Sequence, residues 1–431
     1  MKDKTITVTA TKNELFRSRQ SVIKIYAKTN QTQPYAEIII NQASAYFSIS
    51  QSKFAVPYDG GEVSAEIWSS LGLDYKIDDS VDWLKVSVKN QGNNSYQIIV
   101  AASRNASDSK RYAEVALYDE SRTKELGHLE IVQLSEFSES TDDMIFTVRV
   151  NVWNDFSSTL PLSGTMACCV DWGDNCIEYY TAGPVSHKYN VIEPQSFVVR
   201  ISGEVTALNS SGIEVPSIIE VNQWGNTGLT SMCYAFSNNS VLQRIAENTT
   251  NSFASVRDFY SAFANCINLK EIPENLFYGC SSITSFSETF YNCNALESIP
   301  ATLFSDCTLI YDLYYCFGYC QSLKTIPESL FNKCPELHSI TRLFCECRNL
   351  TSIPVNLFDN NIKIQEAEYA FANCSSLSGE SPYTIIDGKK IHLYERKDAL
   401  DYFLPIYNMH GMFFNYWWLL DDKDLIPDVC K

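Results

Sequence analysis

A fixed interval of 27 residues separates six phenylalanines in the second half of the chain. In most copies a Cys follows the Phe by three residues, a Leu by six, and an Ile-Pro pair by nine and ten. A constant period of this size indicates a solenoid, because one such unit cannot bury its apolar face alone and must stack against its neighbours. The phenylalanines are Phe236, Phe263, Phe290, Phe317, Phe344 and Phe371.

Each unit contains a Leu-x-x-Ile-Pro segment, such as residues 269–273, which we expect to form a short strand. Proline ends such a strand because it has no N–H to donate. We expect the following Leu-Phe-x-x-Cys and Phe-x-x-Cys segments to form short helical turns. The first unit has Asn239 where Cys is expected and Ala246 where Pro is expected, as suits a terminal unit with a different neighbour.

This pattern is similar to the leucine-rich repeats of the BspA-like surface proteins over about residues 229–378. The resemblance implies adhesion through binding of host matrix proteins, host cells or other bacteria. We therefore expect a leucine-rich-repeat solenoid over residues 229–385, followed by a C-terminal cap over residues 386–431.

The outward residues of the expected strands are the first candidates for ligand binding. They form a polar stripe of mixed charge, without the aromatic anchors that usually supply binding hot spots. The stripe is either a weak surface for a glycan or protein, or simply solvated strand. Its members are Lys270, Glu271, Glu297, Ser298, Lys324, Thr325, Thr351 and Ser352.

Aromatic residues offer two other candidate surfaces. One set lies outside the expected strands and comprises Tyr260, Tyr291, Tyr314 and Tyr315. The other set lies in the expected cap and comprises Phe413, Phe414, Tyr416, Trp417 and Trp418. The cap residues form either a sugar-binding platform or, as we expect, the apolar underside of the cap.

Two related segments occupy the N-terminal third of the chain. Residues 5–44 and 96–135 share an alternating strand, an Asn-containing turn, a basic residue and two further strands that close on Gln42 or Gln133. Alternation broken by Asp-Gly-Gly and Asn-rich turns indicates antiparallel β-sandwiches. We expect a complete sandwich over residues 45–135. Residues 1–44 would be the C-terminal part of a truncated sandwich, with an open edge and an uncovered face.

These segments resemble the BACON domain, an immunoglobulin-like module of secreted proteins from gut bacteria of the Bacteroides type. The Gly60-Gly61 turn, Trp83, the segment 105–111 and the terminal residues 131–133 carry the resemblance. The resemblance implies carbohydrate association or, as we expect, a spacer that holds another domain away from the cell surface.

A third sandwich is expected over residues 142–222, after the polar run 136–143. The orders V-D-W-G-D at 170–174 and S-H-x-Y at 186–189 are similar to a polycystic-kidney-disease-type (PKD-like) sandwich. Asp171 or Asp174 could pair with His187 in a catalytic or metal site. We favour a structural interpretation, in which the acidic residues cap a turn and Trp172 and Tyr189 fill the core.

The cysteines and histidines suggest no catalytic or metal centre. Most of the 15 cysteines fall in repeat-phased lines along the expected solenoid, whereas metal ligands must converge on one point. We expect buried free thiols that act as small apolar fillers. The sequence also lacks a nucleophile elbow, a phosphate loop and an HExxH motif. We therefore expect a non-catalytic protein that needs no cofactor and no metal.

Composition narrows the partners further. A formal charge of −18 argues against nucleic acid, because phosphate contacts need clustered Lys and Arg. No run of 18 apolar residues indicates a membrane span, and the N-terminus has no apolar signal segment. We nevertheless interpret the chain as a fragment of a secreted or outer-surface protein, with a lipid anchor possible upstream.

We expect a monomeric, adhesin-like protein that recognises a host or bacterial surface protein, or a glycan, through the solenoid. One alternative is a glycan-binding protein of a polysaccharide-uptake system that uses the BACON-like domains. Another is an accessory region of a glycoside hydrolase.

Overall fold

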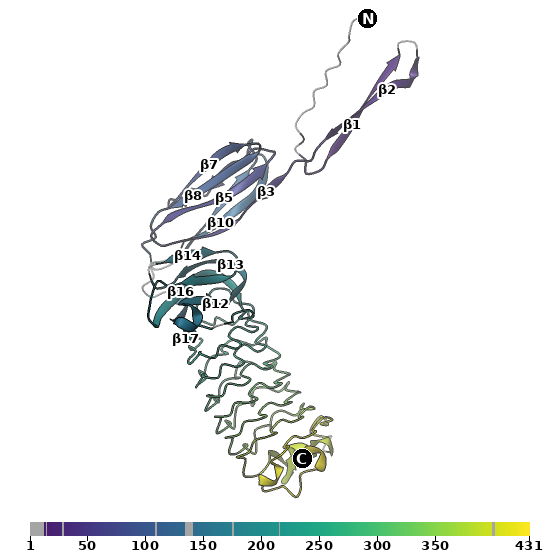
Figure 1. Ribbon diagram of the computed structural model, residues 1–431. Helices are drawn as coiled ribbons and strands as arrows, with labels where there is room; N and C mark the ends of the chain where they lie inside the picture. The colour runs from purple at the N-terminus through teal and green to yellow at the C-terminus, as the bar shows by residue number, and fades with distance from the viewer. Residues whose placement is uncertain are drawn as a thin grey trace. The chain divides into compact units, whose positions relative to one another are not determined.

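A computed structural model describes residues 13, 15–27, 30–107, 110–133, 141–174, 176–214, 216–398 and 401–431. Within them the protein is almost all β, as the sequence predicted (Figure 1). The chain divides into two compact units, Met1–Ser138 and Glu139–Lys431. Residues 1–12 of the expected truncated sandwich and residues 136–140 of the expected linker lie outside the described residues. Helical structure in the described ranges is limited to four short 3₁₀ turns: η1 (Val152–Asn154), η2 (Leu393–Asp398), η3 (Trp417–Leu419) and η4 (Asp428–Cys430).

The first unit begins with a hairpin, in which β1 (Arg19–Ala27) pairs antiparallel with β2 (Asn30–Gln42). Val22, Ile38 and Ile39 on this hairpin are exposed. An apolar face of two strands is left uncovered, as the sequence led us to expect for residues 1–44.

Two four-stranded sheets form the rest of the first unit. Their strands share one apolar core that draws on both sheets, including Ile67 and Ile98 from one and Val115 and Leu129 from the other. All pairings are antiparallel except that of β10 with β4. One sheet has the order β3 (Phe47–Ile49), β5 (Gly61–Ser69), β8 (Ser95–Ala102), β7 (Leu84–Gly92). The other has the order β4 (Lys53–Val56), β10 (Glu125–Gln133), β9 (Arg111–Tyr118), β6 (Asp74–Ile77).

The second unit opens with a five-stranded antiparallel sheet and a separate strand pair. The burial of β11 alternates strictly, so that Met144, Phe146, Val148 and Val150 all point into the core. The sheet order is β14 (Ile177–Tyr180), β13 (Leu162–Asp171), β16 (Gln195–Leu208), β11 (Met144–Val150), β17 (Ile218–Gln223), and the strand pair is β12 (Ser157–Leu160) with β15 (Val185–Lys188).

The sheet of the second unit and the repeat units share one continuous apolar core. Phe146 of β11 packs edge-to-face on Phe236, with ring centroids 5.9 Å apart. Ala207 and Glu220, at the ends of β16 and within β17, form parallel bridges with Ser231 and Arg244. The first repeat unit is therefore built directly onto the sheet, which the sequence did not indicate.

The 27-residue units, which we call coils, stack one after another beyond β17 (Figure 1). The six predicted phenylalanines stand above one another in this stack. Neighbouring rings of the set are nearly parallel, with centroids 5.4–5.7 Å apart. A second row, Phe277, Phe304, Phe331 and Phe358, stacks in the same way at 5.7–6.1 Å. Offset stacking of this kind adds to the burial of each ring.

The prediction of strands at the Leu-x-x-Ile-Pro segments is wrong. Residues 269–273 form no strand, and neighbouring coils are joined there by single bonds such as that from Lys324 N to Glu297 O at 3.3 Å. The proline of each segment cannot donate, so the hydrogen bonds cannot continue as a ladder. Isolated parallel bridges instead join the coils at Ser285, Asp312, Ser339, Glu366 and Asn408.

The C-terminal segment contains a hairpin of β18 (Tyr383–Ile386) and β19 (Lys389–His392), so the strand predicted near 388–394 is present. The chain then forms a further coil. Asn408 bridges Glu366 at an interval of 42 residues rather than 27, and Phe413 stacks on Phe371 at 5.8 Å. The cap thus continues the phenylalanine row after an insertion, which the sequence interpretation missed.

Candidate functional site

All eight residues of the predicted polar stripe are exposed. Backbone bonds bring positions 270, 297, 324 and 351 into one line, because each amide donates to the carbonyl one coil before it. Lys324 pairs with Glu297 at 2.7 Å, but both side chains are about 60% exposed. Such an exposed pair contributes about 0–1 kcal/mol. The structure therefore assembles the stripe as a shallow, solvated polar line.

Two positions in each coil adopt a left-handed backbone conformation. Such φ values are uncommon outside glycine and are tolerated best by Asn. The first row has φ between 50° and 58° and contains Tyr234, Ser261, Glu288, Tyr315, Arg342 and Tyr369. The second row has φ between 58° and 64° and contains Asn238, Asn265, Asn292, Tyr319, Glu346 and Asn373.

The second left-handed row has the composition that its backbone favours. Asn265 Nδ2 donates to Asn238 Oδ1 at 2.9 Å, and Asn292 repeats this bond to Asn265 at 2.7 Å. Asn373 donates to Glu346 Oε1 at 2.7 Å. The amides thus form a ladder along the coils, which Tyr319 interrupts.

The first left-handed row contributes to a group of large side chains that we call the tyrosine–arginine cluster. Arg342 Nη1 donates to the hydroxyl of Tyr315 at 2.5 Å. The Arg342 guanidinium also lies 5.2 Å from the Tyr315 ring and 5.0 Å from the Tyr369 ring. Tyr291 packs edge-to-face on Tyr315 at 5.3 Å and on Tyr319 at 5.4 Å. The cluster is Tyr291, Tyr315, Tyr319, Arg342 and Tyr369, and every member is half-buried.

Glycines leave room for two rings of the tyrosine–arginine cluster. A Cβ on Gly318 would come within 2.5 Å of the Tyr315 ring. Gly411 has φ of 57° and lies equally close against Tyr369. A side chain at either position would therefore displace a tyrosine of the cluster.

The tyrosines predicted outside the strands are only partly brought together. Tyr291 and Tyr315 belong to the cluster, and Tyr314 packs edge-to-face on Tyr315 at 4.9 Å. Tyr260 packs instead on Tyr234 at 5.2 Å, and burial raises the pKa of Tyr260 to about 12. Sequence reasoning missed Arg342 and Tyr369, although they lie 27 and 54 residues after Tyr315 and so share its repeat position.

The cap aromatics divide between the two interpretations offered for them. Phe413 is buried in the phenylalanine row, as expected for the underside of the cap. Phe414 and Trp418 are exposed, at 41% and 49%. Lys431 Nζ lies 4.4 Å from the Trp417 ring and covers it in part.

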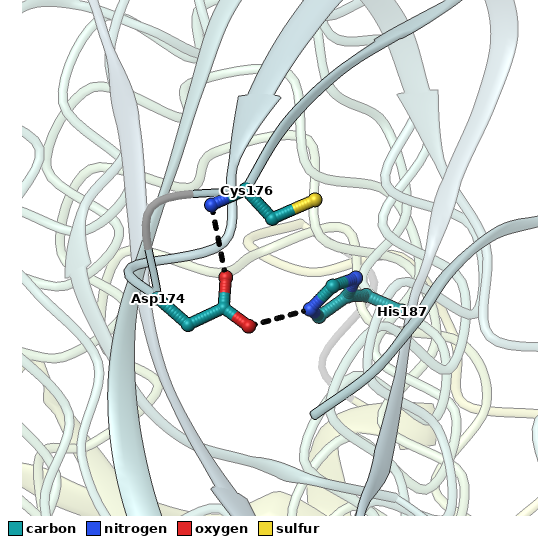
Figure 2. A group of neighbouring side chains, drawn as sticks. All are labelled: Asp174, Cys176 and His187. Atoms are coloured by element: carbon teal, nitrogen blue, oxygen red, sulfur yellow. Dashed lines mark hydrogen bonds and ion pairs between the residues drawn. The ribbon is translucent and has the colours of Figure 1, made fainter. Parts of the chain in front are cut away.

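Asp174, Cys176 and His187 lie together at one end of the five-stranded sheet (Figure 2). Asp174 and Cys176 belong to the turn between β13 and β14, while His187 lies on β15 of the separate strand pair. Asp174 Oδ2 and His187 Nε2 are 2.8 Å apart, and one ligand atom from each of the three residues lies within 4.8 Å of the others. Figure 2 shows the thiol and the imidazole directed toward the same region beside the carboxylate.

The predicted structural roles in this region are confirmed. Gly173 N donates to Asp171 Oδ1 at 2.9 Å and Cys176 N donates to Asp174 Oδ1 at 3.1 Å, so both carboxylates cap the turn. Trp172 and Tyr189 are buried. The interpretation was incomplete, because it left out Cys176 and because the capping carboxylate of Asp174 also contacts His187.

The surroundings fix the His187 ring. Trp172 stacks on it at 5.1 Å and Tyr189 packs edge-to-face at 4.6 Å. Glu178 Oε2 lies 3.9 Å from Nδ1, on the side away from Asp174, and accepts bonds from Trp172 and from Tyr180 at 2.8 and 2.7 Å. Burial, then the negative charges of Glu178, Asp174 and Asp171, raise the pKa of the Cys176 thiol.

All 15 cysteines are free thiols, and all but Cys176 and Cys233 are buried. They do more than fill space. Cys293 Sγ donates to the carbonyl of Phe263 at 3.3 Å, and Cys320 and Cys347 repeat the bond to Phe290 and Phe317 at 3.3 and 3.2 Å. In the first coil Asn239 takes the place of this Cys and donates to Ile218 O at 3.0 Å.

Ser381, His392 and Asp422 form a buried cluster in the C-terminal segment. Ser381 Oγ lies 2.9 Å from His392 Nδ1 and also donates to Asp422. A catalytic triad needs the serine and the acid on opposite ring nitrogens and an accessible hydroxyl. Here both contact the same side of the ring, Asp422 being 3.3 Å from Nδ1, and Ser381 is fully buried. The arrangement is that of a structural hydrogen-bond network.

No protein family model matches the chain, and no curated protein matches it. None of the helices in the described part of the chain has the length and apolar character needed to cross a membrane.

Proposed function

We propose that this protein is a non-catalytic binding protein of the outer cell surface or the secreted fraction, and that the tyrosine–arginine cluster is its recognition surface. The partner is a host or bacterial surface protein, or a glycan. The coils act as a leucine-rich-repeat solenoid of the BspA-like kind. The immunoglobulin-like sandwiches of the BACON and PKD-like type act as spacers.

The observation that carries this proposal is the presence of bulky side chains at left-handed backbone positions. Each such conformation costs about 1–3 kcal/mol, and strain of this kind gathers at functional sites. The neighbouring row relieves the strain with Asn at four of its six positions. The first row instead has Tyr315, Arg342 and Tyr369, which are poorly suited to the backbone. Their side chains therefore have a role that Asn cannot take.

The chemistry of the cluster suits recognition. Tyr and Arg are among the residues that dominate binding hot spots, whereas the polar stripe contains neither. The Arg342 guanidinium is held between two rings, so little rotamer freedom is lost when a partner binds. Tyrosine rings present flat apolar faces together with hydroxyl groups, a combination that binds both protein and sugar surfaces. Display of many copies on a cell would strengthen weak individual contacts.

The test compares variants of the whole chain, because the core continues across residues 222–229 and a cut there would expose it. Tyr319→Asn and Arg342→Asn place a residue that tolerates the left-handed backbone, so the fold is retained. Lys270→Ser and Lys324→Ser change the polar stripe in the same coils. Binding is screened on mucin-type and plant glycans and on host matrix proteins.

We expect the cluster variants to lose at least tenfold in affinity and the stripe variants to bind as the unchanged protein does. Loss confined to the stripe variants would assign recognition to the stripe and reject the cluster. Glycan binding that none of the four substitutions alters would point instead to residues 1–135, and so to carbohydrate capture or an accessory role beside a glycoside hydrolase.

A further inference from the structure

The turn between β13 and β14 brings three metal-ligating groups of different chemistry to one place (Figure 2). We infer that Asp174, Cys176 and His187 form a binding site for a zinc-type divalent transition-metal ion. This inference is independent of the proposed recognition surface, because the site lies on the sheet and the strand pair rather than on the coils.

The ligand set selects the class of metal. A thiolate and an imidazole favour Zn²⁺ and related transition metals, whereas Ca²⁺ and Mg²⁺ prefer oxygen ligands alone. Three protein ligands leave a fourth tetrahedral position for water. One atom from each group already lies within 4.8 Å of the others, so convergence on a single ion needs only small side-chain movements.

The groups around the ligands are placed as a metal site requires. A ligating histidine usually donates its other N–H to a carboxylate, which fixes the tautomer and the ring orientation. Glu178 is 3.9 Å from His187 Nδ1, while Nε2 faces Asp174. Glu178 is itself held by bonds from Trp172 and Tyr180. This carboxylate–histidine arrangement is the feature that a simple turn cap does not need.

Metal binding has a definite proton balance. The Cys176 thiol forms a bond from sulfur to the ion and releases its proton to water. His187 binds through the Nε2 lone pair, so its ring proton resides on Nδ1 and faces Glu178. The carboxylates of Asp171, Asp174 and Glu178 raise the pKa of the thiol in the metal-free protein, and a bound cation offsets that accumulated negative charge.

A bound ion would join two parts of the fold. Asp174 and Cys176 come from the turn of the five-stranded sheet, and His187 comes from the separate β12–β15 pair. The ion would therefore act as a staple between them, and its binding would protect both segments from hydrogen exchange.

The test uses the whole chain after treatment with a chelator, titrated with Co²⁺ as a spectroscopic substitute for Zn²⁺. We expect one Co²⁺ per chain and a near-ultraviolet charge-transfer band from a sulfur–cobalt bond. Zn²⁺ should displace the Co²⁺, and Mg²⁺ and Ca²⁺ should not. Bound Zn²⁺ should also protect Cys176 from alkylation, as measured by mass spectrometry.

Four variants complete the test. Cys176→Ser should abolish the charge-transfer band, and Asp174→Asn, which still caps the turn, should weaken binding at least tenfold. Glu178→Gln should weaken it about 10- to 100-fold, the usual effect of losing an outer-shell partner. Cys233→Ser is the matched control, because Cys233 is the other half-buried thiol, and it should bind as the unchanged protein does.

Absence of the band from the folded, unchanged protein would overturn the inference. So would a band that persists in Cys176→Ser or disappears in Cys233→Ser, since the cobalt would then be bound by other thiols. Circular dichroism of each variant separates loss of the site from loss of the fold.

Discussion

Arg111 donates from Nε to Oε1 of Gln133 across β9 and β10, at 2.8 Å. The truncated copy repeats this pair, because Arg19 donates to Gln42 across β1 and β2 at 2.6 Å. The two pairs differ in burial: Gln133 is fully buried, whereas the Arg19–Gln42 pair is exposed. A relationship predicted from the internal repeat of the sequence thus occurs in two environments.

Replacing Gln133 with Ala should destabilise the sandwich of residues 45–135. Gln133 Nε2 donates to Ser103 O at 2.7 Å and to Pro57 O at 2.9 Å, so the change removes three bonds from a buried position. Leaving buried partners unpaired costs about 1–3 kcal/mol. Hydrogen exchange of β9 and β10 in the whole chain measures the loss. Gln42→Ala is the control and should change the exchange of β1 and β2 by much less.

Substitutions at Asn292 should separate backbone strain from the amide ladder. Asn292 has φ of 58° and donates to Asn265. Asn292→Ala loses the hydrogen bond and also places a Cβ-bearing residue without a polar side chain in the left-handed region, which costs roughly 1–2 kcal/mol. Asn292→Gly loses the bond alone and should cost about 1 kcal/mol. Denaturant midpoints give both values, and equal losses would show that the backbone conformation contributes nothing.

Thiol reagents should label the native protein at Cys176 and Cys233 well before the other 13 cysteines, which are buried. Burial first, and then the nearby Asp258, raise the pKa of Cys233 to about 11. Only the thiolate reacts, so the labelling rate of Cys233 at pH 8 should be slow and should rise about tenfold per pH unit up to that pKa. Mass spectrometry after alkylation assigns the sites. Under denaturant all 15 should react, and a shortfall would reveal disulfides.

The features that follow the 27-residue period were predictable from sequence. The phenylalanine row and the thiol rows were predicted because identical positions of identical coils must stack. The Asn column at 238, 265 and 292 was also visible, but it was not interpreted as a left-handed position. The strand predicted at Leu269–Pro273 failed because the proline of each coil interrupts the hydrogen-bond ladder.

Contacts between elements of different periodicity could not be predicted in this way. Cys176 meets His187 because two sheets approach each other, and nothing in the spacing of the two residues specifies that approach. The core shared by β11 and Phe236 depends on the same kind of tertiary placement. Arg342 joined the tyrosines only once its repeat position was known to be left-handed.

Phe413 and Phe414 provide the sharpest test of the last coil, because adjacent residues have opposite environments. Phe413 is buried and stacks on Phe371, while Phe414 is 41% exposed. Phe413→Ala should cost about 3–5 kcal/mol, the usual loss for a phenylalanine removed from a core. Phe414→Ala should cost less than half of that, although its ring lies 5.9 Å from that of Tyr369. Denaturant unfolding of the whole chain compares the two. Equal effects would mean that residues 408–415 form a separate cap rather than a seventh layer of the phenylalanine row.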